Sequence, residues 1–169
     1  MDSVTKNPDT SLGAFVHLST FSKYIIPFGN FIFPLIIWTA RRKESFIDEH
    51  GRQALNFQIS TFLYFIFIIS ATISAMFIIA VNMGISENFI FHEEIEIQDL
   101  SAFIPFMVTL AISGVLLLGL FVLEIFGVIS ATVKAGDGKL YKYPLSISFI
   151  KSSNQSKNEQ FNNTKNETL

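Results

Sequence analysis

Hydrophobic positions along the chain gather into three long runs that are separated by charged stretches. The second run is the clearest, because the 34 residues from Gln53 to Ser86 include no Asp, Glu, Lys or Arg. Its apolar part, Ala54 to Val81, would be about 42 Å long as an α-helix at 1.5 Å per residue. A bilayer has a hydrocarbon core of roughly 30 Å. We therefore predict a transmembrane helix within residues 54–82.

The third run, residues 102–133, predicts a second transmembrane helix. Its only charged residue is Glu124. Pro105 lies near its start, where the missing N–H of a proline is tolerated best.

The first run, residues 12–40, is interrupted by four features: Lys23, Pro27, the Gly29-Asn30 pair and Pro34. Its 29 residues are too few for two complete crossings of about 20 residues each. It is therefore one kinked span or a broken, re-entrant pair of half-helices. The expected fold is an all-α integral membrane protein, a small helical bundle with two long transmembrane helices and a broken or re-entrant first hydrophobic segment.

The polar ends of the chain complete the expected organisation. Residues 1–11 read as a flexible N-terminus and residues 12–150 as the membrane domain. Residues 151–169 are Asn-rich and almost free of large apolar side chains, so they cannot bury enough surface to order themselves. We predict a disordered polar tail there.

Charge asymmetry predicts the orientation. The loop 41–53 contains four basic residues, and residues 134–151 contain four lysines, whereas residues 82–101 contain five acidic residues and no Lys or Arg. By the positive-inside rule, the 41–53 loop and the C-terminus are cytoplasmic and the 82–101 loop is external. The expected location is a bacterial inner (cytoplasmic) membrane, crossed more than once.

Two local patterns refine this picture near the membrane surface. Ser45 followed by Asp48 is a capping-box pattern that predicts a helix start near Phe46, although a plain charged loop remains the alternative. Tyr141 and Tyr143 are expected at headgroup level, where aromatic rings with a polar tip are favoured.

Composition excludes several kinds of chemistry. The chain has no cysteine, and its three histidines lie in separate segments without ligand spacing. Phosphate-binding glycine loops and a Ser-His-Asp order are missing, and no basic stripe suits nucleic acid. We expect no catalytic residue, no metal, no cofactor and no nucleic-acid partner, and hence not an enzyme.

Glu124 is the sharpest candidate for a functional residue. It precedes Lys134 by ten residues, about 15 Å of helix rise, which places it near the bilayer midplane. A carboxylate there must be protonated, paired or turned to a wet cavity. Asn30, Asn56 and Gln58 are its expected partners in a candidate intramembrane polar site. The site is either a proton- or ion-coupling centre or a neutral hydrogen-bonded contact between helices.

Small residues recur at multiples of four along the last predicted helix and just beyond it, at Gly119, Gly127, Ala131 and Ala135. Such spacing lets helices approach closely. The stripe is expected to serve packing within the bundle or a homo-oligomer face.

Several separated motifs carry a family resemblance. The order HLSTFSKYIIPFGNFIFPLIIW, FIDEHGRQALNFQIS and VKAGDGKLYKYPLSISFIK resembles a family of small bacterial membrane proteins of unknown function, which is described as similar to the Tic20-type component of the chloroplast import translocon. The family-like positions include His17, Gly29, Pro34, His50, Tyr143 and Pro144. The resemblance implies a fold and a membrane location but no established catalytic residue.

Together these features predict a small scaffold or protein-translocation-related module that contacts the lipid bilayer. The alternatives are a proton-coupled small-solute transporter that uses Glu124, and an accessory subunit of a larger membrane complex. A membrane-protein partner or a homo-oligomer is expected in the first and last cases.

Overall fold

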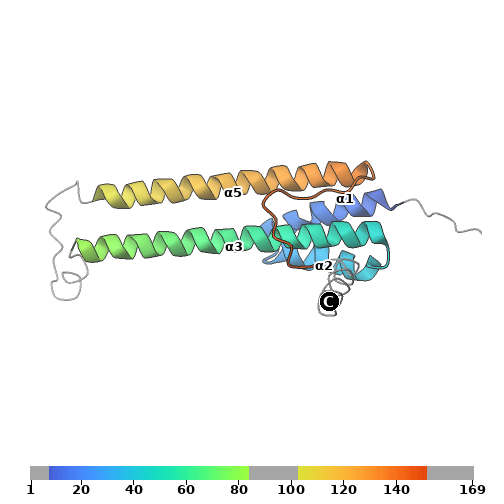
Figure 1. Ribbon diagram of the computed structural model, residues 1–169, viewed down its shortest axis with the longest axis horizontal. Coiled ribbons are helices and arrows are strands. Elements are labelled where there is room, and N and C mark those ends of the chain that lie inside the picture. The colour runs from blue at the N-terminus through green and yellow to red at the C-terminus, as the bar shows by residue number, and fades with distance from the viewer. Residues whose placement is uncertain (1–7, 84–102, 152–169) are drawn as a thin grey trace, which may run out of the picture. The chain divides into compact units, whose positions relative to one another are not determined.

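The structure is a computed structural model that describes residues 8–83 and 103–151. Within these ranges the chain forms helices and turns but no strand. The elements are α1 (Thr10–Leu18), the 3-10 helix η1 (Ser19–Tyr24), α2 (Gly29–Arg41), α3 (Ser45–Asn82) and α5 (Ile104–Gly136), as drawn in Figure 1. The expected all-α fold is confirmed. The predictions for the first seven residues, for most of the external loop and for the tail after Lys151 fall outside the described residues.

The chain divides into two compact units. Unit 1 comprises Met1–Thr61 and Glu124–Leu169, and unit 2 comprises Phe62–Leu123. Helices α3 and α5 each contribute to both units, so the two units are described one after the other.

The first hydrophobic run is broken inside unit 1. Helix α1 continues into η1, and α2 begins only at Gly29 after a tight turn. Pro27 disfavours a helical continuation, because it has no N–H and restricts the residue before it. Phe28 then adopts a left-handed conformation with φ of 60°. The broken pair of short helices is confirmed, and the alternative of one kinked span is wrong.

Glycine is required where η1 meets α2. A Cβ at Gly29 would lie 2.9 Å from the backbone carbonyl of Ser22, which is closer than real side chains come. Pro34 lies inside α2 without ending it and is buried. These two family-like positions therefore serve the packing of the hairpin formed by α1, η1 and α2.

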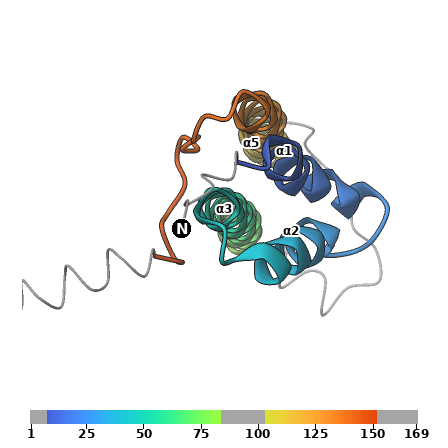
Figure 2. The ribbon, with the colours of Figure 1, turned by 90° about the vertical axis from the view of Figure 1, so that its right-hand side faces the viewer.

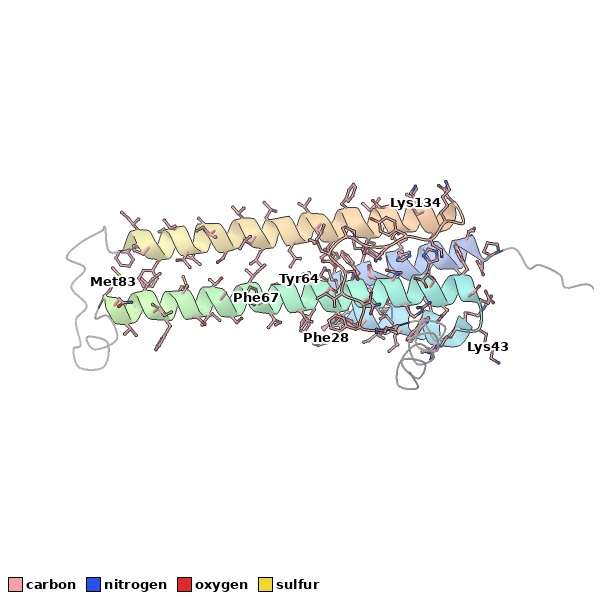
Figure 3. All side chains as sticks on the ribbon, viewed as in Figure 1. Phe28, Lys43, Tyr64, Phe67, Met83 and Lys134 are labelled. Atoms are coloured by element: carbon pink, nitrogen blue, oxygen red, sulfur yellow. The ribbon has the colours of Figure 1, made fainter. Side chains whose placement is uncertain are left out.

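The charged ends of the elements gather at one end of unit 1. The Arg41 guanidinium lies 3.7 Å from the Asp9 carboxylate, so the start of α1 and the end of α2 meet. Lys43 and Lys134 lie at the same end, and Phe28 lies at the other, as Figure 3 shows. The hairpin thus begins and ends beside the basic loop.

Helix α3 starts within one residue of the position that the capping box predicts. Asp48 does not serve as the predicted cap, however. Its carboxylate oxygen Oδ1 accepts a hydrogen bond from the indole N–H of Trp38 at 2.8 Å. Gly51 makes room for this indole, since a Cβ there would overlap the Trp38 ring. The start of α3 is therefore held against α2 by tertiary contacts.

The core of unit 1 lies between α3, α5 and the segment that follows α5. Its buried members are Phe57, Val128, Ala131 and Tyr143. Residues 137–151, which we name the strap, leave the end of α5 and run to α3, while α1 lies next to α5 and α2 next to α3 (Figure 2). The strap is hydrogen-bonded to α3 side chains, as shown below.

Unit 2 consists of the later part of α3 and the earlier part of α5. Many of its large apolar side chains are exposed, and those of Phe67, Phe77 and Val115 are more than half exposed. A side-chain hydrogen bond joins its two helices, between the hydroxyls of Thr72 and Ser113 at 2.6 Å. Among the described residues, α3 and α5 are the two helices long and apolar enough to cross a membrane.

Candidate functional site

Glu124 has a cationic partner that the sequence analysis did not consider. Its Oε2 atom lies 2.5 Å from Nζ of Lys23, which η1 carries at the tip of the hairpin. The Glu124 side chain is 8% exposed and that of Lys23 is 26% exposed. The other carboxylate oxygen, Oε1, is buried without a hydrogen-bond partner in the described part of the chain. The arrangement is an ion pair that fastens the hairpin to α5.

The expected pairing of Glu124 with the amides is wrong, because each amide has a partner elsewhere. Asn30 donates to Oε1 of Gln58 at 2.8 Å and so joins α2 to α3. Asn56 accepts from the backbone N–H of Ile150 at 2.8 Å and donates to its carbonyl at 3.1 Å. With 3% of its surface exposed, Asn56 holds the strap on α3. Each of these amides therefore joins two different elements.

A second hydrogen bond ties the strap to α3. The Ser60 hydroxyl accepts from the backbone N–H of Ile147 at 2.8 Å. Asn56 and Ser60 are one turn apart on the same face of α3. Buried backbone groups require hydrogen bonds. These two side chains provide such bonds for the strap backbone, which forms neither a helix nor a strand there.

Three family-like positions form a buried hydrogen-bonded chain. His17 Nε2 lies 2.7 Å from His50 Nδ1, and the Tyr143 hydroxyl lies 2.9 Å from His17 Nδ1. All three side chains are at most 2% exposed. The chain joins α1, α3 and the strap, three segments that no spacing in the sequence connects.

Burial keeps this chain uncharged at neutral pH. It lowers the pKa of His17 from 6.5 to about 3, with His50 as the second cause. Burial likewise raises the pKa of Tyr143 well above its ordinary value of 10.0. A neutral imidazole has one ring nitrogen that donates and one that accepts. His17 therefore donates in one of its two contacts and accepts in the other. Which nitrogen donates depends on the tautomer.

The ring of Tyr143 explains part of the small-residue stripe. It stacks on Phe57 with ring centroids 4.0 Å apart. A Cβ at Gly127 would lie 3.1 Å from Tyr143 and 3.2 Å from Phe57, so this glycine makes room for both rings. Gly119 meets nothing within 4 Å. The stripe thus divides into a packed part in unit 1 and an open position in unit 2.

The headgroup level of Tyr143 stays a prediction, but its side chain does not face the membrane surface as an exposed anchor would. The residue is 2% exposed, because its hydroxyl finds His17 and its ring finds Phe57. Tyr141 is partly exposed, and Pro144, which follows Tyr143, is exposed. Leu145 then reverses the chain direction with a φ of 57°.

The donor set of the site does not suggest a metal centre. In the described ranges no group of three or more His, Cys, Asp or Glu side chains is placed to hold a metal ion. His17 and His50 use ring nitrogens on each other, and Glu124 faces Lys23. The chemistry available here is proton sharing and charge pairing between elements.

The fold and these contacts define a class of protein: a small helical membrane protein whose polar side chains join a short helical hairpin to two long apolar helices. The chain belongs to the magnetosome magnetite crystal formation protein family (MamF/MmsF), which it matches over residues 8–150. The match includes every described helix and the contacts of unit 1. The expected membership of a small bacterial membrane protein family is confirmed, but no comparison supports a likeness to the Tic20-type component. No curated protein and no solved structure matches the chain significantly.

Proposed function

We propose that the chain is a scaffold protein of a bacterial membrane that acts in the process which names its family, magnetosome magnetite crystal formation. One observation carries this proposal. The deeply placed polar side chains of unit 1, which an enzyme or transporter would direct toward a substrate, are directed toward each other across different elements. Such contacts fix the geometry of a surface, and among the described residues they leave these side chains engaged with each other rather than with a substrate. On this reading the protein is not an enzyme.

A test of the scaffold role uses the native bacterium. Deletion of the gene should change the size or number of the intracellular crystals in electron micrographs, and the Tyr143→Phe variant, which removes one hydrogen bond, should restore them. Cross-linking in native membranes should recover the chain with other membrane proteins. A deletion strain whose crystals match the wild type would contradict the crystal-formation role, and recovery of translocase components would favour a translocation-related module instead.

A proton-coupled small-solute transporter is the second candidate, supported by one specific feature. Glu124 Oε1 is buried and has no hydrogen-bond partner among residues 8–83 and 103–151, so this oxygen could accept a proton or a hydrogen bond from a solute donor. The measurement is proton uptake into proteoliposomes that carry a pH-sensitive dye. Uptake that disappears in Glu124→Gln would favour the transporter, and equal, background uptake by both proteins would favour the scaffold. An accessory subunit would show no uptake and would co-purify with one larger complex.

The proposed orientation places the charged end of unit 1 in the cytoplasm of a bacterium, with the 41–53 loop and the C-terminus inside and the 82–101 loop outside the inner membrane. Support comes from the clustering of Arg41, Lys43 and Lys134 at one end of unit 1. The ion pair of Asp9 with Arg41 adds the N-terminus to this cytoplasmic side.

The hairpin on this reading enters the membrane without crossing it. Helix α1 has 9 residues and α2 has 13 residues, about 14 and 20 Å as helices, which is short of a 30 Å hydrocarbon core. The chain has no native cysteine, so single cysteines give a clean test. Cysteines at Ser3 and Ser156 should react with a membrane-impermeant maleimide only after lysis, and one at Ser86 should react from outside. External labelling at Ser3 would refute the re-entrant placement.

A further inference from the structure

The hairpin formed by α1, η1 and α2 carries many exposed apolar side chains. At its tip, Ile25 is 85% exposed and Phe28 is 64% exposed. Phe15 on α1 and Ile36 on α2 are also more than half exposed. Beside membrane-spanning helices, such a surface packs against acyl chains. We infer that the hairpin fills only the cytoplasmic leaflet, an inference that rests on its proposed re-entrant placement, and that the protein therefore binds preferentially to a bilayer that is convex on that side.

Helix α2 runs along α3 in the opposite direction. Asn30, near the start of α2, donates to Gln58 of α3, and Trp38, near the end of α2, donates to Asp48 of α3. The two contacts are eight residues apart on α2 and ten residues apart on α3, about 12 and 15 Å of helix rise. Because these distances are similar, α2 lies roughly parallel to the axis of a helix that is expected to cross the membrane.

Helix α1 and η1 follow α5 in the same way. Thr10, at the start of α1, lies near Gly138, just beyond the end of α5, because a Cβ at this glycine would lie 3.6 Å from the Thr10 Cγ2 atom. At the other end, Lys23 of η1 pairs with Glu124 of α5. Both arms of the hairpin are thus held at two levels, and the hairpin cannot turn flat on the membrane surface without breaking these contacts.

The length of α2 places the tip of the hairpin near the bilayer midplane. Its 13 residues span about 20 Å and end at Arg41, in the basic loop that is expected among the headgroups. Each headgroup layer takes about 5 to 8 Å, so about 12 to 15 Å of α2 remain inside a hydrocarbon core of roughly 30 Å. Figure 3 shows Phe28 at the opposite end of unit 1 from Lys43. The hairpin therefore reaches about half of the core, which is one leaflet.

The hairpin and the strap add cross-sectional area to this leaflet alone. Two helices of about 10 Å diameter occupy roughly 160 Å². The strap adds the exposed apolar side chains of Leu140, Ile147 and Phe149 on the same side of the membrane. On the proposed topology α3 and α5 cross both leaflets, whereas the hairpin and the strap accompany them only in the cytoplasmic one. The described residues of unit 2 belong to α3 and α5 and to the turns at their ends, so they add no counterpart in the outer leaflet.

Extra area in one leaflet couples the protein to membrane curvature. A bilayer accommodates such area by bending until the larger leaflet is convex, and segments inserted into one leaflet are accordingly sensitive to curvature. The contacts at both ends of the hairpin keep the added area in place. By linkage, a protein that prefers a curved bilayer also favours the bending of a flat one, by the same free energy. The surface that fits unit 1 is therefore a narrow tube or small vesicle whose outer face is the leaflet that holds the hairpin.

The test uses giant vesicles that contain the full chain and from which a narrow membrane tube is pulled, because the outer leaflet of the tube is convex. Single-cysteine variants are labelled from outside with a membrane-impermeant maleimide dye. Ser156→Cys then reports the molecules whose hairpin lies in the outer leaflet, and Ser86→Cys reports the molecules of the opposite orientation. Relative to a lipid dye, the Ser156→Cys label should be enriched in the tube about twofold, and the Ser86→Cys label should be depleted by a similar factor. The two variants are matched controls, since chain, lipid and vesicle are otherwise the same.

Equal distribution of the two labels between tube and vesicle would overturn the curvature preference, and so would enrichment of the Ser86→Cys label instead. Labelling of Ser3→Cys in intact cells separates these results from a failure of the hairpin placement. Reaction only after lysis would uphold the re-entrant hairpin, and equal distribution in the tube would then overturn the curvature preference alone. Reaction of Ser3→Cys from outside would overturn both, because the first hydrophobic run would then cross the whole bilayer.

Discussion

The two parts of helix α3 have similar secondary structure but opposite surroundings. From Ile47 to Thr61, in unit 1, most side chains are buried and many of them are polar. From Phe62 onward, in unit 2, the side chains are apolar and mostly exposed. Helix α5 repeats the contrast in reverse order, with its buried side chains from Glu124 onward. A helix can therefore be held by protein along one part and leave the other part to lipid.

This difference indicates what stabilises each unit. Unit 1 is held by polar contacts between elements far apart in sequence, each of which leaves a buried polar group behind when it is broken. Unit 2 has apolar surface that lipid covers as well as protein does, so few contacts within it carry stability. The same kind of substitution should consequently have different effects in the two units.

The largest difference is expected for glycine substitutions. Gly51→Ala should lower the free energy of unfolding by about 3 kcal/mol, because the new Cβ would overlap the Trp38 ring in unit 1. Gly119→Ala in unit 2 meets open space and should change it by less than about 1 kcal/mol, in the stabilising direction, since alanine favours a helix. Thermal unfolding in detergent measures both. Equal losses at the two positions would contradict the comparison.

Acid should weaken unit 1 through His17, which belongs to α1 and lies outside the two long helices. Its folded-state pKa of about 3 is below the ordinary 6.5, so between these values the unfolded state binds more protons. The free energy of unfolding therefore falls as the pH falls from 6.5 toward 3. At pH 4.5 the loss should be about 2 kcal/mol relative to pH 7, as an order of magnitude.

The variant His17→Gln isolates this effect. It is less stable at pH 7, because it loses contacts with His50 and Tyr143, but its unfolding midpoint should change much less between pH 7 and pH 4.5. A variant with the same pH dependence as the wild type would assign the effect to other groups. The α3 part of unit 2, residues 62–82, contains no Asp, Glu, His, Lys or Arg, so this stretch should contribute nothing in this range.

The ion pair between Lys23 and Glu124 should contribute less to the free energy of unfolding than a fully buried ion pair does. Lys23→Met leaves Glu124 buried without a cation and should cost about 2 kcal/mol, below the usual range for a buried pair because Lys23 is a quarter exposed. The double variant Lys23→Met/Glu124→Leu should recover most of this loss, since it removes both charges together. Additive losses in the thermal unfolding cycle would show that the two residues do not interact.

The smallest effect is expected in unit 2. Thr72→Val removes the hydroxyl contact with Ser113 and should cost about 0.6 kcal/mol, the average for a side-chain hydrogen bond between membrane helices. Ser60→Ala in unit 1 is the matched hydroxyl deletion. It removes the acceptor of the Ile147 N–H and should cost more, about 1 to 2 kcal/mol. The reverse order of these two losses would remove the distinction between the units.

The fold was largely predictable because its main features are local in sequence. The absence of charge between Gln53 and Ser86 is enough to predict α3, and the breakers around Pro27 are enough to predict that the first run is not one helix. The hairpin itself had to be left as one of two alternatives, since a kink and a turn use the same residues. The choice between the kink and the turn depends on the tertiary contact of Gly29 with Ser22.

The contacts between the candidate polar residues were not predictable from their positions in the sequence. Glu124 was singled out by its expected depth, which stays a prediction, but its partner Lys23 is 101 residues away, and the turn after η1 brings it to α5. His17, His50 and Tyr143 were named as positions of a family resemblance and otherwise gave no spacing that indicates contact. Their occurrence in three separate motifs of one resemblance was the available sign that they meet in space.

The strap is synthesised long after the residues of α1 and α3 that it contacts. Asn56 and Ile150 are 94 residues apart, and ribosomes add about 5 to 20 residues per second. Roughly 5 to 20 s therefore pass between the synthesis of Asn56 and that of its partner. The interval is longer between His17 and Tyr143, which are 126 residues apart. During that time these groups must be satisfied by water, by lipid headgroups or by the insertion machinery, because hydrocarbon offers them no partner. The nascent chain is therefore expected to keep its first half near the membrane surface until the last helix has been inserted.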